Sequence, residues 1–152
     1  MRRLSPGLIV VALALVASGC GSDTKAANDY VDAVNRAQSE FATKFDQLSG
    51  QITSTSTAAQ DRQTLDGFRQ AIDKVVADFR AVKAPDKVKR LHGRLISEIS
   101  AYGREIDKAK RAFSDDDPQA IVKAQADLVS AVTRVQAQIN ATIADINKKL
   151  RE

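Results

Sequence analysis

The chain has 152 residues, of which 23 are Lys or Arg and 19 are Asp or Glu, and its formal net charge is +4. A chain of this length normally folds as one domain around a single hydrophobic core. The chain has a single cysteine, which excludes a disulfide within it. With only one histidine as well, few side chains remain for nucleophilic or metal chemistry. The domain must therefore be held together by packing.

The first 22 residues differ in composition from the rest of the chain. Two arginines are followed by an apolar run from Leu8 to Ala17, and small residues then lead into Cys20. An apolar helix of about ten residues rises about 15 Å, roughly half the hydrocarbon thickness of a bilayer, so this run is short for a membrane span. A positive start, a short apolar run and small residues together indicate a signal peptide.

The residues around the expected cleavage point are Ala17-Ser18-Gly19-Cys20. This stretch resembles the lipobox of bacterial lipoproteins, in which the cysteine is acylated and becomes the first mature residue. The resemblance implies a signal peptide over residues 1–19 and a lipid anchor at Cys20. At least two acyl chains would hold the protein at the extracytoplasmic face of a cell membrane, in the periplasm or outside the cell. An uncleaved membrane anchor and ordinary secretion are the alternatives.

Cleavage before Cys20 would remove two arginines and lower the net charge to about +2, so charge gives no reason to expect nucleic acid as a partner. An exported protein would not meet cytoplasmic nucleic acid either. The small polar residues that follow predict a lipidated N-terminus with a flexible spacer over residues 20–26. The helical domain is expected over residues 27–152. No stretch alternates apolar and polar residues with the period of a strand.

Apolar residues three or four positions apart predict four amphipathic helices, at 27–48, 58–82, 85–113 and 118–149. Two of the three connections between them are short. The sequence therefore predicts an all-α, antiparallel up-down four-helix bundle with coiled-coil-like packing. A long helical hairpin that dimerises is the alternative. Every aromatic residue of the mature chain lies on a predicted core stripe: Tyr30, Phe41, Phe45, Phe68, Phe79, Tyr102 and Phe113.

Local residues mark the starts of two of these helices. Thr57 and Gln60 have the spacing of a capping box before the second helix. Asp117 followed by Pro118 is a strong start signal for the fourth helix. The Ser- and Thr-rich stretch 49–61 is expected to be mainly a solvated connector, with a binding loop as the alternative.

Few residues could carry catalysis or bind a metal. Acylation would consume the thiol of Cys20, and His92 lies at the edge of the third apolar stripe between Arg90 and Arg94. We interpret His92 as a packing or solvent-facing residue, because a general base needs a nearby acidic partner and a nucleophile. The Glu-x-x-His pairs of metal-binding bundles are absent from the sequence. Asp115–Asp117 lacks the spacing of a Ca²⁺ loop. The sequence thus predicts no catalytic residue, no metal site and no cofactor.

The third predicted helix has a basic face. Its basic residues outnumber its acidic ones: Lys83, Lys87, Lys89, Arg90, Arg94, Arg104, Lys108, Lys110 and Arg111. Such a face would suit anionic lipid headgroups or cell-wall phosphates. The alternative is an ordinary solvated face of the bundle.

In its lipobox, length, polar spacer and helix count, the chain resembles the small helical lipoproteins of bacterial envelopes. We therefore expect a membrane-anchored, non-enzymatic envelope lipoprotein that binds a partner protein or envelope component through its helical surface. The alternative is a carrier of lipids or small molecules, with an apolar cavity lined by Phe41, Phe45, Phe68 and Phe79. A carrier requires an enclosed apolar cavity, whereas partner binding requires a packed core and an exposed apolar surface.

Overall fold

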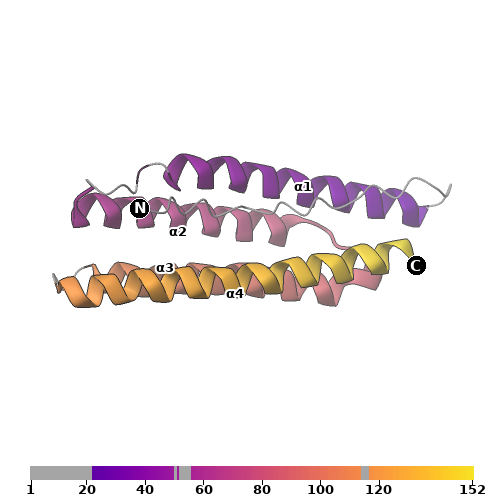
Figure 1. Ribbon diagram of the computed structural model, residues 1–152. Coiled ribbons are helices and arrows are strands. Elements are labelled where there is room, and N and C mark those ends of the chain that lie inside the picture. The colour runs from indigo at the N-terminus through magenta and orange to yellow at the C-terminus, as the bar shows by residue number, and fades with distance from the viewer. Residues whose placement is uncertain (1–21, 50, 52–55, 114–116) are drawn as a thin grey trace.

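The computed structural model describes residues 22–49, 51, 56–113 and 117–152. Its elements follow one another along the chain as α1 (Ser22–Ser49), α2 (Ala58–Ala81), the 3-10 helix η1 (Asp86–Val88), α3 (Lys89–Ala112) and α4 (Pro118–Arg151). There is no strand among these residues. Successive helices run in opposite directions, with α1 and α2 in one layer and α3 and α4 in the other (Figure 1). The predicted all-α four-helix bundle is confirmed, and the alternative of a long helical hairpin is wrong.

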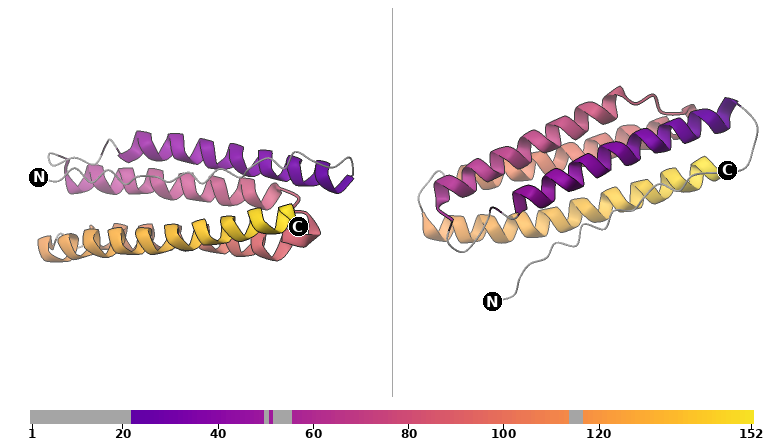
Figure 2. Two further views of the ribbon diagram at one scale, coloured as in Figure 1. Left: turned by 45° about the vertical axis from the view of Figure 1, so that its right-hand side comes forward. Right: turned by 90° about the horizontal axis from the view of Figure 1, so that it is seen from above.

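Three parts of the chain meet at one end of the bundle. The start of α1, the connection from α2 to α3 and the end of α4 lie together there in every view (Figures 1 and 2). We call the half of the bundle at this end the basal half, which comprises residues 22–35, 70–100 and 135–152. The distal half comprises the other described residues of the helices and their connections. At the distal end, α1 stops short of the ends of α2 and α4 (Figures 1 and 2).

The core runs along the whole bundle but is most completely enclosed in the basal half. There, apolar residues of all four helices interlock three or four positions apart, as expected for helices packed along their lengths. The largest side chains that are fully buried all come from this half: Tyr30, Val31, Val34, Ile72, Phe79, Val88, Leu95, Thr142, Ile143 and Ile146.

Both predicted capping motifs are present. The Thr57 side chain accepts a hydrogen bond from the backbone N–H of Gln60, and the Gln60 side chain accepts one from the N–H of Thr57. Asp117 Oδ1 accepts from the backbone N–H of Gln119 at 2.9 Å, with Pro118 in the first turn. These contacts satisfy N–H groups that no helical carbonyl can reach, so they position the starts of α2 and α4.

Two helix starts differ from the sequence prediction. Helix α1 begins at Ser22, so the flexible spacer predicted over residues 20–26 is wrong for residues 22–26. Ala27 is buried in the core, and Lys25 pairs with Asp29 at 2.5 Å, one turn further along the helix. These contacts extend the helix toward its N-terminus. The third helix was expected to begin at residue 85, but the 3-10 helix η1 precedes it. The fully buried Val88, the last residue of η1, has backbone angles outside the α-helical region, so α3 begins at the next residue.

Candidate functional site

The predicted signal peptide at 1–19 and the predicted lipidation site Cys20 lie outside the described residues. The described chain starts two residues after Cys20, at the basal end of the bundle (Figure 1). Within the described ranges, no helix combines the length and apolar character that a membrane crossing needs.

The four phenylalanines expected to line a cavity instead fill space in the bundle. Phe45, Phe68 and Phe79 are buried. The ring of Phe45 lies 5.0 Å from that of Phe68 and 5.9 Å from that of Phe41, distances at which aromatic rings pack against each other. Phe79 lies apart from them, against His92 in the basal half. Only Phe41 remains half-exposed.

A surface groove lies between α1 and α2 at mid-length of the bundle. It is open to solvent, has a volume of about 340 Å³ and is mainly apolar. Its walls come from the two helices of one layer, namely Ala37, Glu40, Phe41 and Lys44 of α1 and Gly67, Gln70, Ala71, Lys74, Val75 and Asp78 of α2.

Small residues create this groove. At its distal end, α1 and α2 come so close that a Cβ on Gly67 would lie 2.7 Å from Cδ2 of Leu48. Further along, Ala37 and Ala71 face the same space from opposite helices and are too short to fill it. Part of the Phe41 side chain is therefore left exposed on the groove wall.

Charged side chains border the apolar groove. Lys74 Nζ of α2 contacts Glu40 of α1 at 2.9 Å and Asp78 at 2.7 Å, so it ties the two helices together. These hydrogen bonds raise the pKa of Lys74 and keep its side chain protonated. The bond to Asp78 has the larger effect and the bond to Glu40 the next largest. Lys44 also borders the groove, without a carboxylate partner among the described residues. An apolar strip between charges of both signs can accept apolar side chains flanked by polar ones.

The sequence placed His92 at the edge of an apolar stripe, but the structure buries it. It lies on α3 and contacts residues of α1 and α2. Its Nε2 lies 2.9 Å from the carbonyl oxygen of Phe79, and its Nδ1 lies 3.2 Å from the Tyr30 hydroxyl. A carbonyl can only accept, so Nε2 carries a hydrogen. The lowered pKa of His92 favours the neutral imidazole, in which Nδ1 accepts from the Tyr30 O–H, and both ring nitrogens are engaged inside the protein.

Burial determines how these two side chains titrate. Loss of hydration lowers the pKa of His92, although the bond to the Phe79 carbonyl partly opposes this. Burial raises the pKa of Tyr30 to about 12. His92 therefore has the packing role that was one of the two expected from the sequence. Its partners lie 13 and 62 positions away in the chain, which is why periodicity alone could not place it in the core.

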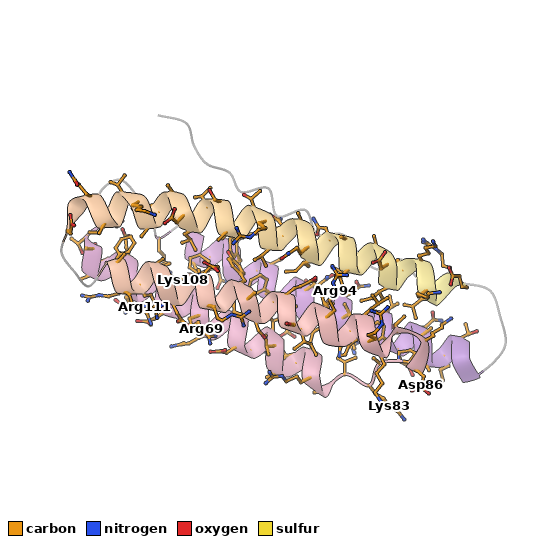
Figure 3. The ribbon with its side chains drawn as sticks, turned by 90° about the horizontal axis from the view of Figure 1, so that it is seen from below. Arg69, Lys83, Asp86, Arg94, Lys108 and Arg111 are labelled. Atoms are coloured by element: carbon orange, nitrogen blue, oxygen red, sulfur yellow. The ribbon has the colours of Figure 1, made fainter. Side chains whose placement is uncertain are left out.

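Three of the nine basic residues on the predicted basic face of the third helix pair with carboxylates. Arg94 pairs with Glu98 at 2.8 Å and Lys108 with Glu105 at 2.9 Å, while Lys110 pairs with an aspartate of α2. Figure 3 shows Lys108 near one end of this face and Lys83 at the other. Exposed pairs of this kind contribute little to stability, but they reduce the local positive charge.

In the described part of the chain, no cluster of His, Cys, Asp or Glu is arranged to hold a metal ion. Asp117 acts as a helix cap, and Asp115 and Asp116 lie outside the described residues. No protein-family model matches the chain, and neither a curated protein nor a solved structure does. Of two recesses on the described surface, the α1–α2 groove is mainly apolar, whereas the one lined by Gln51, Gln60 and Gln63 is mainly polar. The α1–α2 groove is therefore the better candidate for binding apolar side chains.

Proposed function

We propose that this protein is a membrane-anchored lipoprotein of the bacterial cell envelope that binds a partner protein in the α1–α2 groove, without catalysis. The observation that carries the proposal is the contrast between a filled interior and an open apolar groove. Phe45, Phe68 and Phe79 occupy the space that a carrier would keep for its ligand. The groove instead leaves Phe41 accessible from outside.

The chemistry of the groove supports a protein partner. Its apolar strip suits two or three apolar side chains of a partner segment, such as those that an amphipathic helix presents on one face. Glu40, Lys44, Lys74 and Asp78 at its border offer charges of both signs, which would orient that segment. A membrane lipid would need a longer and more enclosed apolar volume for its acyl chains.

Two further observations support an anchored, non-catalytic role. The lipobox-like stretch ending at Cys20 gives the only cysteine a role as the attachment point of a lipid anchor. His92, the only histidine, uses both ring nitrogens for internal hydrogen bonds, so neither is available to a substrate.

Site-specific photocrosslinking in intact cells tests the proposed partner site. A benzophenone amino acid at Gln70, an exposed residue of the groove, should form a covalent adduct with a partner protein. The same probe at Gln138, an exposed residue of α4 away from the groove, is the control and should form no adduct.

A second substitution links the adduct to the groove. Ala71→Glu places a charged side chain in the apolar strip and should abolish the adduct at Gln70. Ala77→Glu adds the same charge at an exposed position of α2 outside the groove and should leave the adduct unchanged. An adduct that persists with Ala71→Glu, or forms equally at Gln138, would contradict binding in the groove.

A further inference from the structure

The basal end of the bundle brings together residues far apart in the sequence. η1 packs against α4, and Lys87 Nζ donates a hydrogen bond to the carbonyl oxygen of Leu150 at 3.0 Å. This contact holds the α2–α3 connection against the last turn of α4. We call the surface formed by residues 82–90 and 148–152 the basal tip. In Figure 3, Lys83 and Asp86 are labelled at this end of the molecule.

The basal tip is strongly basic. It has seven exposed basic side chains, Lys83, Lys87, Lys89, Arg90, Lys148, Lys149 and Arg151. Its two carboxylates are Asp86 and Glu152. Lys149 pairs with Glu152 at 2.5 Å. The other six basic side chains have no carboxylate partner within the described ranges.

The opposite end of the bundle differs in charge. There, Asp117 caps the start of α4, and Asp61 and Arg62 lie side by side in the first turns of α2. Beside them, Lys110 of α3 is paired with Asp66 of α2. With seven basic residues and two carboxylates, the basal tip has a formal charge of about +5, against +4 for the whole chain.

Cys20 lies two residues before the start of α1, so a lipid anchor there would bring the membrane to the basal end of the bundle. Two residues span at most about 7 Å, so an anchor at Cys20 would hold the start of α1 against the membrane. Charges of the basal tip that come within the screening length of about 8 Å at physiological ionic strength would then act on lipid headgroups.

We propose that the basal tip rests on the anionic headgroups of the membrane in which the protein is anchored. This inference rests on the lipid anchor of the proposed function and adds a second, electrostatic contact to it. The two contacts together orient the bundle, because the anchor alone would leave it free to tilt. They hold the basal half at the membrane and direct the distal half, with Val122 and Val129 exposed on α4, away from it.

The full protein, reconstituted into vesicles, provides the test. Acylation of Cys20 would consume the only natural thiol, so Ala81→Cys introduces a single labelling site at the end of α2 beside the basal tip. Ala59→Cys, exposed in the first turn of the same helix, is the matched control. A fluorophore at position 81 should become about twofold less accessible to acrylamide in vesicles containing phosphatidylglycerol than in phosphatidylcholine vesicles. A fluorophore at position 59 should not change.

Charge reversal then separates a specific contact from net charge. Reversing Lys83, Lys148 and Arg151 to glutamate should remove the protection at position 81, as should salt of about 0.5 M. Reversing Arg36, Arg104 and Arg134, which are exposed on the sides of the bundle, changes the net charge equally and should leave the protection in place.

Three outcomes would overturn the inference: equal accessibility in both kinds of vesicle, equal loss with both triple variants, or displacement by inorganic phosphate beyond that by chloride of equal ionic strength. The mass of the purified protein tests the proposed anchor separately. An unmodified Cys20 would contradict the lipoprotein function, whereas protection that is absent from an acylated protein would contradict only the membrane contact.

Discussion

In the basal half of the bundle, side chains from all four helices are fully enclosed, whereas in the distal half the core opens toward solvent. Ile143 and Ile146 of α4 are 1% and 0% exposed, but Ile121 and Leu128, on the same apolar stripe nearer the start of the helix, are only partly buried. The helix is continuous and amphipathic throughout, so its local periodicity does not explain the difference. The cause is the neighbouring helix, because α1 ends before it reaches the first turns of α4 (Figure 1).

This contrast indicates a division of roles within one small domain. The basal half is the more fully enclosed part, with a buried Tyr30–His92 hydrogen bond, and it lies next to the proposed anchor. The groove at mid-length would provide the surface for the proposed partner. Regions with less buried apolar surface are also those that open most readily, so partner binding would fall in the less stable part of the bundle.

Removing one aromatic ring from each region should give the largest difference in stability. Phe79→Ala leaves a cavity in the enclosed basal core and should lower the free energy of unfolding by about 3–5 kcal/mol. Phe41→Ala removes a ring that is already half-exposed and should lower it by about 1 kcal/mol. Urea unfolding followed by circular dichroism measures both.

If the Phe79→Ala variant does not fold, Phe79→Leu, which should lose about 1–2 kcal/mol, keeps the comparison measurable. Equal losses at positions 79 and 41 would contradict the difference between the two regions.

Acidification should weaken the basal half through His92. Its pKa in the folded protein lies below the unfolded value of about 6.5, so the unfolded chain takes up a proton first as the pH falls. The associated stability is present above pH 6.5 and is lost progressively below it. The free energy of unfolding should therefore decrease between about pH 7.5 and pH 5.5.

His92→Leu provides the control for this prediction. It removes the printed partner of the buried Tyr30 hydroxyl and one of two hydrogen bonds to the Phe79 carbonyl, which still accepts from the Val82 N–H, and should cost about 2 kcal/mol at pH 7.5. It should also remove the dependence on pH over this range. If the free energy of unfolding changes with pH equally in the wild-type protein and in the variant, His92 is not the group that causes the dependence on pH.

Two glycines give a smaller test of local packing. Gly93→Ala meets no neighbouring atom within 4 Å and should raise the free energy of unfolding by up to about 1 kcal/mol, because alanine favours the helix. Gly67→Ala would press against buried Leu48, so the helical gain should be cancelled or reversed. Thermal unfolding of the two variants, compared with the parent, should give shifts that differ by several degrees. A similar gain at both positions would mean that α1 and α2 are not closely packed at the distal end of the groove.

The sequence predicted most of the fold because helices leave local signals. Apolar spacing located all four helices, and Thr57 and Asp117 marked two starts through side chains that bond to nearby N–H groups. The start of α1 was predicted too late, because the burial of Ala27 and the Lys25–Asp29 pair outweigh a polar composition.

The candidate site was harder to predict, because it depends on what faces each side chain. Phe41 and Phe45 lie one turn apart on the same stripe, yet only Phe45 is buried. The difference arises from Ala37 and Ala71, which leave the space beside Phe41 unfilled. Periodicity identifies the inward face of a helix, but the size of the residues on the facing helix decides where a groove forms.

The proposed function and the proposed membrane contact both depend on the lipid anchor, which intact-mass spectrometry of protein extracted from the membrane fraction tests directly. We expect a chain that begins at Cys20 and carries the added mass of at least two acyl chains. The Cys20→Ala variant should lose both the cleavage and the added mass. A wild-type protein with an unmodified Cys20, or a Cys20→Ala variant that is still cleaved and stays membrane-bound, would contradict the account.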